Sequence, residues 1–263
     1  FVAYVGTAHS LDSNFKSKVM NALFAAGTLR IYKKNPVLAK TSAAKEELRQ
    51  LGVPHAVIAP VGLDNAVLKK NIPADEKMRL RKEHGFEADD VILCNVSRLS
   101  WEKRPLELID LFLQVKGKKK FKLIIVGNGP LEEELNEKIR KNGLEKEVKI
   151  YPNVPYEKMW EIYEMSDYYL NMNKGEIFGM AIMEAVYYKT SVAAIRALGP
   201  SVTLKDMKGH KLCENDDEMA EWITGPYPSE KDLQESSEKM AATFTWDRCA
   251  DAFLQASSEK SSR

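Results

Sequence analysis

The sequence predicts an α/β protein built on a parallel sheet, and two observations lead to this class. From Val91 onward, short apolar runs alternate with segments of helical periodicity. The apolar runs are nearly continuous, as in strands that are covered on both faces. Such alternation favours parallel strands joined by crossover helices. The chain has 263 residues, more than one average domain, so we expect two domains, or one domain and part of another.

The elements of the larger domain follow in order. Strands are expected at Val91–Val96, Phe121–Val126, Val148–Tyr151, Tyr168–Met172, Ser191–Ile195 and Lys211–Cys213. The clearest helices are expected at Pro105–Val115, Leu131–Asn142, Tyr156–Met165 and Phe178–Tyr188. Between them, the Asn-Gly pairs at 128–129 and 142–143 indicate turns. The run Lys116–Lys120 indicates a solvated loop, with a phosphate or lipid patch as the alternative.

Residues 1 to about 68 resemble the second half of another α/β domain. Strands are expected at Phe1–Val5, Val37–Lys40 and Ala56–Pro60, and helices at Asn14–Ala26 and Ser42–Leu51, with Ser42 as an N-cap. Because the chain opens directly in an apolar run, we expect it to lack the start of this domain, roughly 100 residues by typical domain size. Leu68–Asp90 is charged and weakly periodic, which predicts a linker. The larger domain is expected at 69–240, and a C-terminal helix at 241–263 is expected to pack back toward the first domain.

Composition narrows the classes of partner. The 39 basic and 38 acidic residues give a net charge of +1, so we expect no nucleic-acid partner, and any anion site must be local. The cysteines and histidines are scattered without metal-ligand spacing, which predicts no metal site and a reducing, cytoplasmic compartment. The basic amphipathic helix Asn14–Arg30 is expected to pack within the first domain. Its alternative is peripheral contact with the inner face of an anionic membrane.

Ligands of open parallel sheets bind beyond the carboxyl ends of the strands, and three strand ends here carry suggestive residues. After the first strand of the larger domain, Arg98 and Lys103 could neutralise a diphosphate, with ordinary surface charge as the alternative. After the second strand, Gly127 and Gly129 permit a ligand to approach the backbone closely. A tight turn between strand and helix explains these glycines equally well.

A third strand end, Gly175–Ala185, is the most informative. Phe178, Gly179 and Met180 open a helix whose leading amides suit a phosphate or a sugar hydroxyl. Glu176 precedes this helix, and Glu184 lies inside it, roughly 7 to 8 Å along the axis from Gly179. The two carboxylates are expected to bracket a sugar nucleotide. The alternative is that both are ordinary helix acids.

Five segments, taken in order, resemble the group 1 family of retaining glycosyltransferases. Glu176 and Glu184 resemble its paired-glutamate motif, and Arg98-Leu99 with Lys103 resembles its Arg-Leu-x-x-x-Lys phosphate segment. Val126–Leu131 is similar to the family's Gly-x-Gly-Pro turn. Thr41-Ser42 together with Ala59–Asp64 is similar to the end of its first domain. Phe244–Asp247 is similar to its C-terminal Phe-Ser-Trp.

The resemblance implies a GT-B architecture, with two Rossmann-like, doubly wound domains, the N-terminal one incomplete in this chain. It implies transfer of a hexose from a nucleoside-diphosphate sugar to a glycan or lipid-linked acceptor, without metal or other cofactor. Arg98 and Lys103 would bind the donor diphosphate, Glu176 the sugar hydroxyls and Glu184 the ribose. The backbone of Phe178, Gly179 and Met180, with the Gly127–Gly129 turn, would hold the donor. His9 would reach the sugar from the first domain.

Two loops depart from the family pattern. Asn171–Lys174 replaces a Pro-Ser pair, and Ala197–Ser201 replaces Gly-Gly-Pro-x-Glu. These departures motivate an alternative function, a non-catalytic sugar-nucleotide-binding partner of an active glycosyltransferase. A sugar-nucleotide epimerase of the same fold would need a histidine-and-carboxylate set that the sequence does not show. An NAD-dependent oxidoreductase would need a third glycine in the Gly127–Gly129 turn.

Overall fold

The computed structural model describes residues 3–5, 27–64 and 68–261. The chain forms two compact units: Phe1–Asp64 with Ala242–Arg263, and Asn65–Ala241. His9 and the expected helix Asn14–Ala26 lie outside the described residues. Within the described ranges, every helix is too short or too polar to cross a lipid bilayer.

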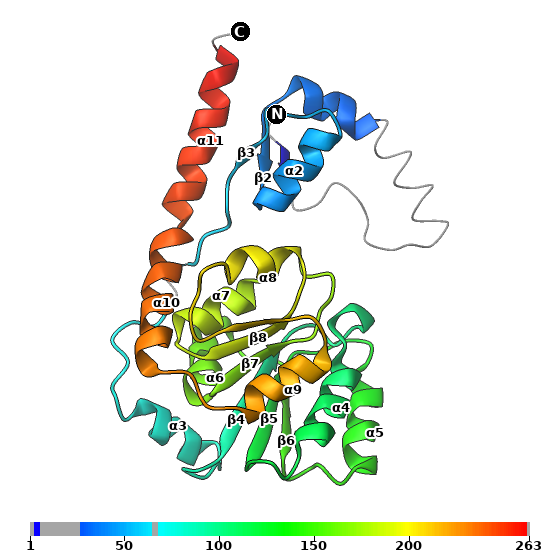
Figure 1. The fold of residues 1–263 in the computed structure, drawn as a ribbon, viewed down its shortest axis with the longest axis vertical. Coiled ribbons are helices and arrows are strands. Elements are labelled where there is room, and N and C mark those ends of the chain that lie inside the picture. The colour runs from blue at the N-terminus through cyan, green and yellow to red at the C-terminus, as the bar shows by residue number, and fades with distance from the viewer. Residues whose placement is uncertain (1–2, 6–26, 65–67, 262–263) are drawn as a thin grey trace. The chain divides into compact units, whose positions relative to one another are not determined.

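The second unit is built on a six-stranded parallel sheet with the order β6-β5-β4-β7-β8-β9 (Figure 1). Its strands are β4 (Val91–Val96), β5 (Phe121–Val126), β6 (Val148–Tyr151), β7 (Tyr168–Asn171), β8 (Ser191–Ile195) and β9 (Lys211–Cys213). Every residue of β7 and β8 is buried, which explains why their sequences are apolar without alternation. The parallel α/β class predicted from the sequence is therefore confirmed.

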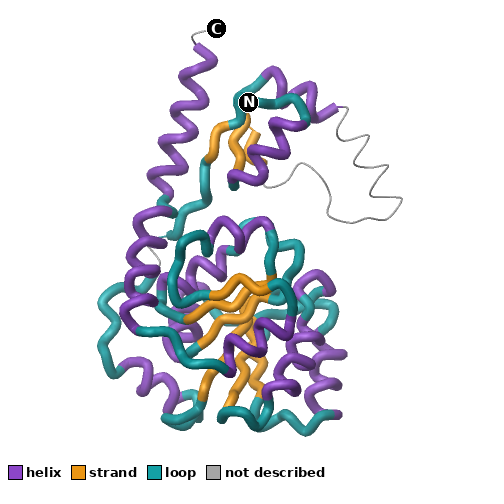
Figure 2. The backbone as a smooth tube through the Cα atoms, viewed as in Figure 1, coloured by secondary structure: helices purple, strands orange, loops and turns teal. Residues whose placement is uncertain are grey.

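Helices cover both faces of this sheet, which appears enclosed in Figure 2. The helices between residues 68 and 243 are α3 (Glu76–Glu83), α4 (Pro105–Val115), α5 (Glu132–Lys141), α6 (Met159–Met165), α7 (Met180–Tyr187), α8 (Leu198–Thr203), α9 (Asp216–Thr224) and α10 (Glu230–Thr243), with 3₁₀ turns η1 (Trp101–Lys103) and η2 (Tyr156–Lys158). On one face, α4, α5 and α9 bury side chains such as Phe112, Leu135 and Ile223 against the strands. On the other, α6 and α7 contact the sheet, and α3 packs on α6. Each fully buried side chain of this size stabilises the fold by roughly 1.5–3 kcal/mol.

The linker expected at Leu68–Asp90 is wrong in part, because α3 occupies its middle. This helix is anchored by Arg81, whose side chain donates to the Met165 and Asp90 carbonyls at 3.0 and 3.2 Å. The same guanidinium binds the Asp167 carboxylate at 2.7 Å. A buried arginine therefore takes much of the place of an apolar stripe, and hydrophobic periodicity could not reveal the helix.

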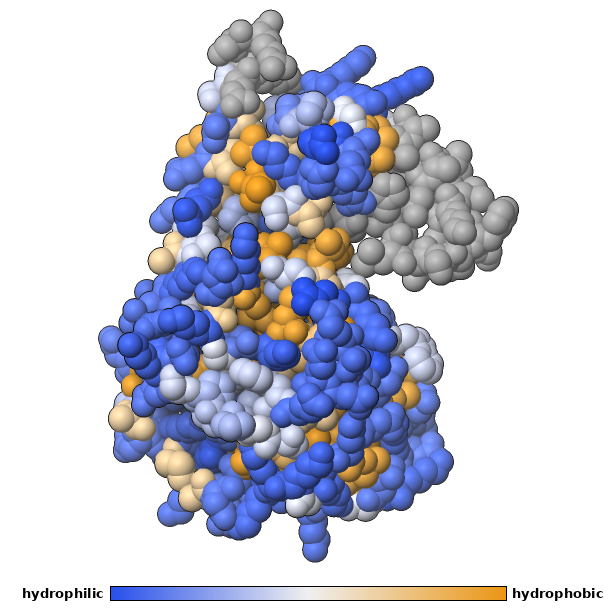
Figure 3. All heavy atoms as spheres, viewed as in Figure 1, coloured by the Kyte–Doolittle hydropathy of each residue, from blue (hydrophilic) through white to orange (hydrophobic). Residues whose placement is uncertain are grey.

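The lysine-rich run Lys116–Lys120 lies between α4 and β5. Lys120 pairs with Asp89 at 2.5 Å, and Lys119 donates to the carbonyls of Ile223 and Gly225 at 3.0 and 2.6 Å. These contacts fit the interpretation as a surface loop. Hydrophilic residues cover most of the second unit on the face that Figure 3 shows.

The first unit contains a three-stranded parallel sheet in the order β1-β2-β3, with β1 (Ala3–Val5), β2 (Val37–Ala39) and β3 (Val57–Ile58). On one face, α2 (Ser42–Gln50) packs with the helical segment 27–34. On the other, α11 (Trp246–Ser261) packs Cys249, Ala252 and Ala256 against Leu38 and Ala59. The N-cap of α2 is Thr41, not Ser42 as predicted, because the Thr41 hydroxyl accepts from the Ala44 amide at 3.0 Å.

Candidate functional site

The candidate site lies at the carboxyl edge of the sheet in the second unit. Strand β4 pairs in parallel with β5 on one side and with β7 on the other. The chain therefore reverses its winding direction between β4 and β7. In open α/β sheets, the loops on either side of such a point separate and leave a crevice for ligands. The loops that follow β4, β5, β7 and β8 all leave this edge of the sheet.

The loop after β4 is seated on the glycine turn after β5. The Leu99 amide donates to the Asn128 carbonyl at 2.9 Å, and the Leu131 amide donates to the Leu99 carbonyl at 3.0 Å. A Cβ atom at Gly127 would lie 1.9 Å from the Ser97 oxygen. At Gly129 it would lie 2.4 Å from the Leu99 oxygen. The missing side chains thus make room for the neighbouring loop, which favours the tight-turn interpretation of both glycines.

Lys103, after β4, and Glu176, after β7, meet at this edge of the sheet. The Lys103 ammonium lies 2.9 Å from Oε2 of Glu176. The side-chain amides of Asn173 and Asn171 donate to the same oxygen at 3.2 and 3.4 Å. Burial opposes ionisation of Glu176, but the Lys103 hydrogen bond and charge, with the two amides, outweigh it and lower the pKa of this carboxyl. Glu176 is therefore an ionised, oriented acceptor.

Arg98 supplies a second cation at the same edge. It follows β4 directly and is exposed. Within the described part of the chain, its guanidinium has no recorded hydrogen bond or ion pair. The loop that carries it is fixed by the Gly127–Gly129 turn, so an anion can be bound here without breaking an existing contact.

The start of α7 is the third component of the site. Gly179 caps this helix with a φ of +87°, a left-handed conformation that favours glycine. Among the described residues, no side-chain cap of this helix start is recorded, so its leading amides are suited to an anionic or hydroxyl ligand. Gly199, after β8, braces the turn, because its amide donates to the Glu176 carbonyl at 2.8 Å. A Cβ atom at Gly199 would lie 2.5 Å from the Phe178 nitrogen.

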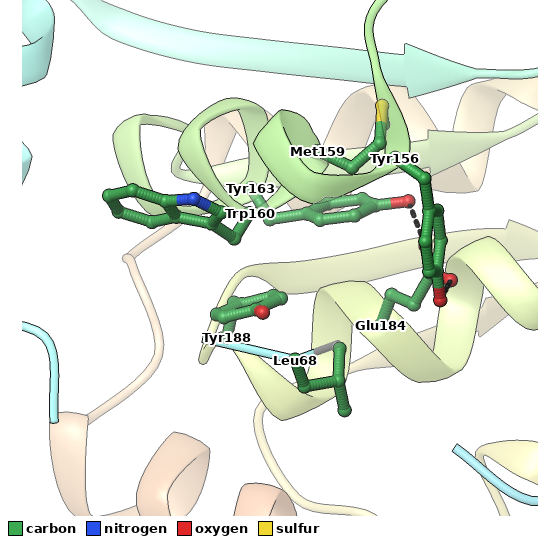
Figure 4. Close-up of a pocket in the computed structure, with 7 residues that line it drawn as sticks. All are labelled: Leu68, Tyr156, Met159, Trp160, Tyr163, Glu184 and Tyr188. Carbon is green, nitrogen blue, oxygen red and sulfur yellow. Dashed lines mark hydrogen bonds between the residues drawn. The ribbon is translucent and has the colours of Figure 1, made fainter. Parts of the chain in front are cut away.

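Glu184 lies inside α7 and is 8% exposed. Its two carboxylate oxygens accept hydrogen bonds from the hydroxyls of Tyr163 at 2.8 Å and Tyr156 at 3.1 Å (Figure 4). Burial raises the pKa of Glu184, and the two hydroxyls offset only part of this effect. These residues line a narrow cavity, together with Leu68, Met159, Trp160 and Tyr188. Its free volume of about 10 Å³ is close to the roughly 10–15 Å³ that one water molecule needs.

The structure brings most of the predicted residues to one sheet edge. Lys103 and Glu176 are in direct contact, and the Phe178–Met180 turn follows Glu176 in the same loop. Tyrosine hydroxyls donate to both oxygens of Glu184, and its role in binding the ribose stays a prediction. Position 9 is outside the described residues, so the proposed role of His9 stays a prediction.

Sequence reasoning missed several residues that build the site. Tyr156 and Tyr163 are seven residues apart in a segment predicted as helical, and that spacing puts both side chains on one face. Asn171 and Asn173 were singled out only as departures from a family pattern. Their role as donors to Glu176 could not be read from the sequence, because it depends on how the loop after β7 folds back.

The chain matches a family model described as glycosyl transferases group 1 over residues 76–240. A D-inositol 3-phosphate glycosyltransferase of Mycobacterium avium (strain 104) is 26% identical over 288 residues, covering 96% of this chain and 63% of the relative. The amylovoran biosynthesis glycosyltransferase AmsD of Erwinia amylovora is 34% identical over 112 residues, covering 42% of this chain and 31% of the relative. The chain thus spans about three fifths of the first of these relatives.

Solved structures share the fold. HepE of Anabaena, crystallised with UDP and glucose, superposes with a TM-score of 0.78 at 19% identity, covering 100% of this chain and 71% of HepE. Sucrose-phosphate synthase of Thermosynechococcus elongatus gives a TM-score of 0.81 at 16% identity, covering 99% of this chain and 68% of the synthase. At these identities the likeness shows the fold, which is the GT-B architecture expected from the sequence.

Proposed function

Because the chain belongs to the group 1 family of glycosyl transferases, we propose that it transfers a hexose from a nucleoside-diphosphate sugar to an acceptor hydroxyl with retained configuration. The observation that carries this proposal is the contact between Lys103 and Glu176 at 2.9 Å. It brings a phosphate-binding cation and a hydroxyl-binding carboxylate to one point of the sheet edge. A sugar diphosphate presents the matching groups, a phosphate and sugar hydroxyls, side by side.

Each group of the donor has a proposed partner. Arg98 and Lys103 bind the diphosphate, and the leading amides of α7 bind the phosphate next to the sugar. Glu176 accepts hydrogen bonds from the sugar hydroxyls. Glu184 binds the ribose once its hydrogen bond from the Tyr156 hydroxyl has broken, which frees one carboxylate oxygen. Tyr156 is 45% exposed.

The proposed transfer breaks the bond between C1 of the sugar and the diphosphate oxygen, and the electron pair leaves with the diphosphate. Arg98 and Lys103 stabilise the negative charge that develops there. The acceptor oxygen bonds to C1 on the face that the diphosphate leaves, and the acceptor proton passes to the departing phosphate oxygen. In this scheme no side chain acts as the base. The scheme also needs no metal ion, and undiminished turnover in EDTA would support that point.

The first experiment is calorimetric titration of the full-length protein with UDP, the nucleotide present in crystals of HepE. We expect binding in the wild type and none in Arg98→Ala, with Arg140→Ala, an exposed arginine at the end of α5, as the matched control. A screen of sugar donors and of glycan and lipid-linked acceptors, with anomeric analysis of the product, then tests transfer. If the wild type fails to bind any nucleoside diphosphate at millimolar concentration, the proposal is wrong.

The non-catalytic alternative predicts binding without turnover. It was motivated by the unusual loops at Asn171–Lys174 and Ala197–Ser201. In the structure, both loops contact Glu176. Asn173 of the first loop donates to the Glu176 carboxylate, and Gly199 of the second donates to the Glu176 backbone carbonyl. Such an arrangement supports a catalytic role for Glu176. Sugar release or transfer in the donor screen decides between the two functions.

A further inference from the structure

Arg104, directly after Lys103, has a left-handed backbone with φ +55° and ψ +48°. Residues with a Cβ atom avoid this region, and asparagine and aspartate tolerate it best. Arginine has no such local compensation. Arg104 is also the N-cap residue of α4 but makes no side-chain cap. Tertiary contacts must therefore hold this turn in place.

The Arg104 side chain provides those contacts. Its guanidinium donates two hydrogen bonds to the carboxylate of Asp216, at 3.0 and 2.8 Å. A third, at 3.3 Å, reaches the carbonyl of Met172. The Arg104 side chain is 14% exposed, against 36% for Asp216. A two-pronged pair of this kind fixes orientation as well as distance. It joins the start of α4, the end of β7 and the start of α9.

Both chain segments that Arg104 holds lead to Glu176. On one side is Lys103, its covalent neighbour, which contacts the Glu176 carboxylate at 2.9 Å. On the other is Met172, which lies between Asn171 and Asn173, the two residues whose amides donate to the same oxygen. The guanidinium itself donates to Asp216 and Met172, and at 3.4 Å to Oε1 of Glu107 in the first turn of α4. No contact with the carboxylate of Glu176 is recorded among the described residues.

We propose that Arg104 and Asp216 are positioning residues, which hold the strained turn after Lys103 and the loop after β7 so that Lys103 and Glu176 meet. The consequence of the Lys103–Glu176 contact, which is that diphosphate and sugar are bound at the same time, rests on the proposed function. The pair acts on the donor only through Lys103 and Glu176. An inert surface ion pair would leave both of these residues unaffected when it is removed.

The test uses glycine, for which the left-handed conformation is ordinary. Asp216→Ala removes the ion pair with Arg104 but leaves arginine in the strained turn. The double variant Arg104→Gly/Asp216→Ala also lacks the ion pair, but a glycine at position 104 needs no side-chain contact to hold the backbone. Asp217→Ala is the matched control, because Asp217 is the next residue of α9 and its carboxylate accepts only from Gln114, at 2.9 Å, among the recorded contacts of the described chain. Asp216→Asn serves if the alanine variant does not fold.

The main readout is the pKa of Glu176 followed by carbon-13 NMR in the absence of nucleotide, with the resonance assigned through Glu176→Gln. We expect this pKa to rise in Asp216→Ala as Lys103 moves away, and to return most of the way in the double variant. UDP affinity should follow, falling roughly tenfold in Asp216→Ala and recovering in the double variant. Asp217→Ala should match the wild type in both measurements.

Two results would overturn the positioning role. One is an Asp216→Ala protein in which the Glu176 pKa equals that of Asp217→Ala. The other is a double variant that behaves like Asp216→Ala, which would show that backbone strain is not what the pair offsets. If the wild type does not bind UDP, the proposed function fails, while the titration of Glu176 still decides the role of the pair.

Discussion

At the scale of single residues, the carboxylate of Glu176 has two unlike oxygens. Lys103, Asn173 and Asn171 all donate to Oε2. No hydrogen bond to Oε1 is recorded among the described residues. One oxygen therefore fixes the side chain, and the other is available to a ligand. This division separates the role of Glu176 in binding sugar from the role of Lys103 in binding phosphate.

Replacing Glu176 should damage transfer far more than nucleotide binding. Glu176→Gln keeps the shape but loses the charge, and UDP lacks the donor hexose whose hydroxyls Glu176 is proposed to bind. We expect kcat to fall roughly 10²-fold, with UDP affinity unchanged within a few-fold, as measured by initial rates and calorimetry. Glu221→Gln, an exposed change on α9, is the control. Unchanged turnover in Glu176→Gln would remove this residue from the site.

The tyrosines around the second unit's core offer a matched pair for measuring a buried hydrogen bond. Tyr163 donates to Glu184, whereas the buried Tyr168 hydroxyl has no recorded partner in the described chain. Tyr163→Phe leaves a buried carboxylate oxygen unsatisfied and should lower the free energy of unfolding by about 1–3 kcal/mol. Tyr168→Phe removes only an unsatisfied hydroxyl and should be neutral or stabilising. Urea unfolding measures both, and equal losses would contradict the assignment.

The position of a residue was predictable where it depends on one element alone. Arg98 and Lys103 were assigned from charge and from their place after a strand, and Gly179 from its place before a helix. The capping of Glu184 by tyrosines and the pairing of Arg104 with Asp216 join residues from separate elements. Their sequence separations, 28 and 112 residues for Tyr156–Glu184 and Arg104–Asp216, follow no local pattern. Only tertiary packing brings these partners together.

At the scale of elements, strands were predicted well because burial on both faces makes them continuous apolar runs. The expected strands Val91–Val96, Phe121–Val126 and Ser191–Ile195 have the bounds found in the structure. Helix α3 was missed for the opposite reason, since its buried anchor is charged. Short turns were also hidden within a helical pattern, as at η2, where a 3₁₀ turn precedes α6.

Strand β8 depends on an imidazole, which gives the protein a testable response to acid. The Val192 amide donates to Nδ1 of His210 at 3.0 Å, and burial lowers the pKa of this histidine to about 4 from 6.5. The unfolded chain binds the proton more tightly, so stability from this group is complete above pH 6.5 and is lost as the pH falls toward 4. The loss should reach up to ~1.4 kcal/mol per pH unit in that range.

The variant His210→Asn keeps a hydrogen-bond acceptor but cannot titrate. We expect its free energy of unfolding, measured in urea between pH 7 and pH 4, to fall less steeply than that of the wild type. His84→Asn is the control, because this histidine is only partly buried and its Nδ1 contacts the Tyr151 hydroxyl instead of the backbone of β8. Parallel slopes in wild type and His210→Asn would show that His210 does not drive the acid response.

At the scale of the whole molecule, the proposed donor site is carried by one unit. Arg98, Lys103, Glu176 and Glu184 all lie in Asn65–Ala241, and the family match at 76–240 lies there too. We therefore expect a fragment of residues 65–241 to bind UDP with an affinity within roughly tenfold of the full chain. Calorimetry on the two proteins tests this expectation. A folded fragment that does not bind UDP would show that the other unit supplies an essential contact.

The order in which the two units can fold follows from the position of α11. On one face of the sheet in the first unit, Leu38 and Ala59 are buried in one cluster with Cys249, Ala252 and Ala256 of α11. On the ribosome, residues 1–64 emerge before residues 65–241, yet that face is covered only once α11 has been synthesised. Residues 65–241 are complete earlier, so the unit that is translated second should fold first, against the usual N-to-C order. Nascent chains arrested at increasing lengths should resist protease at the second unit before the first.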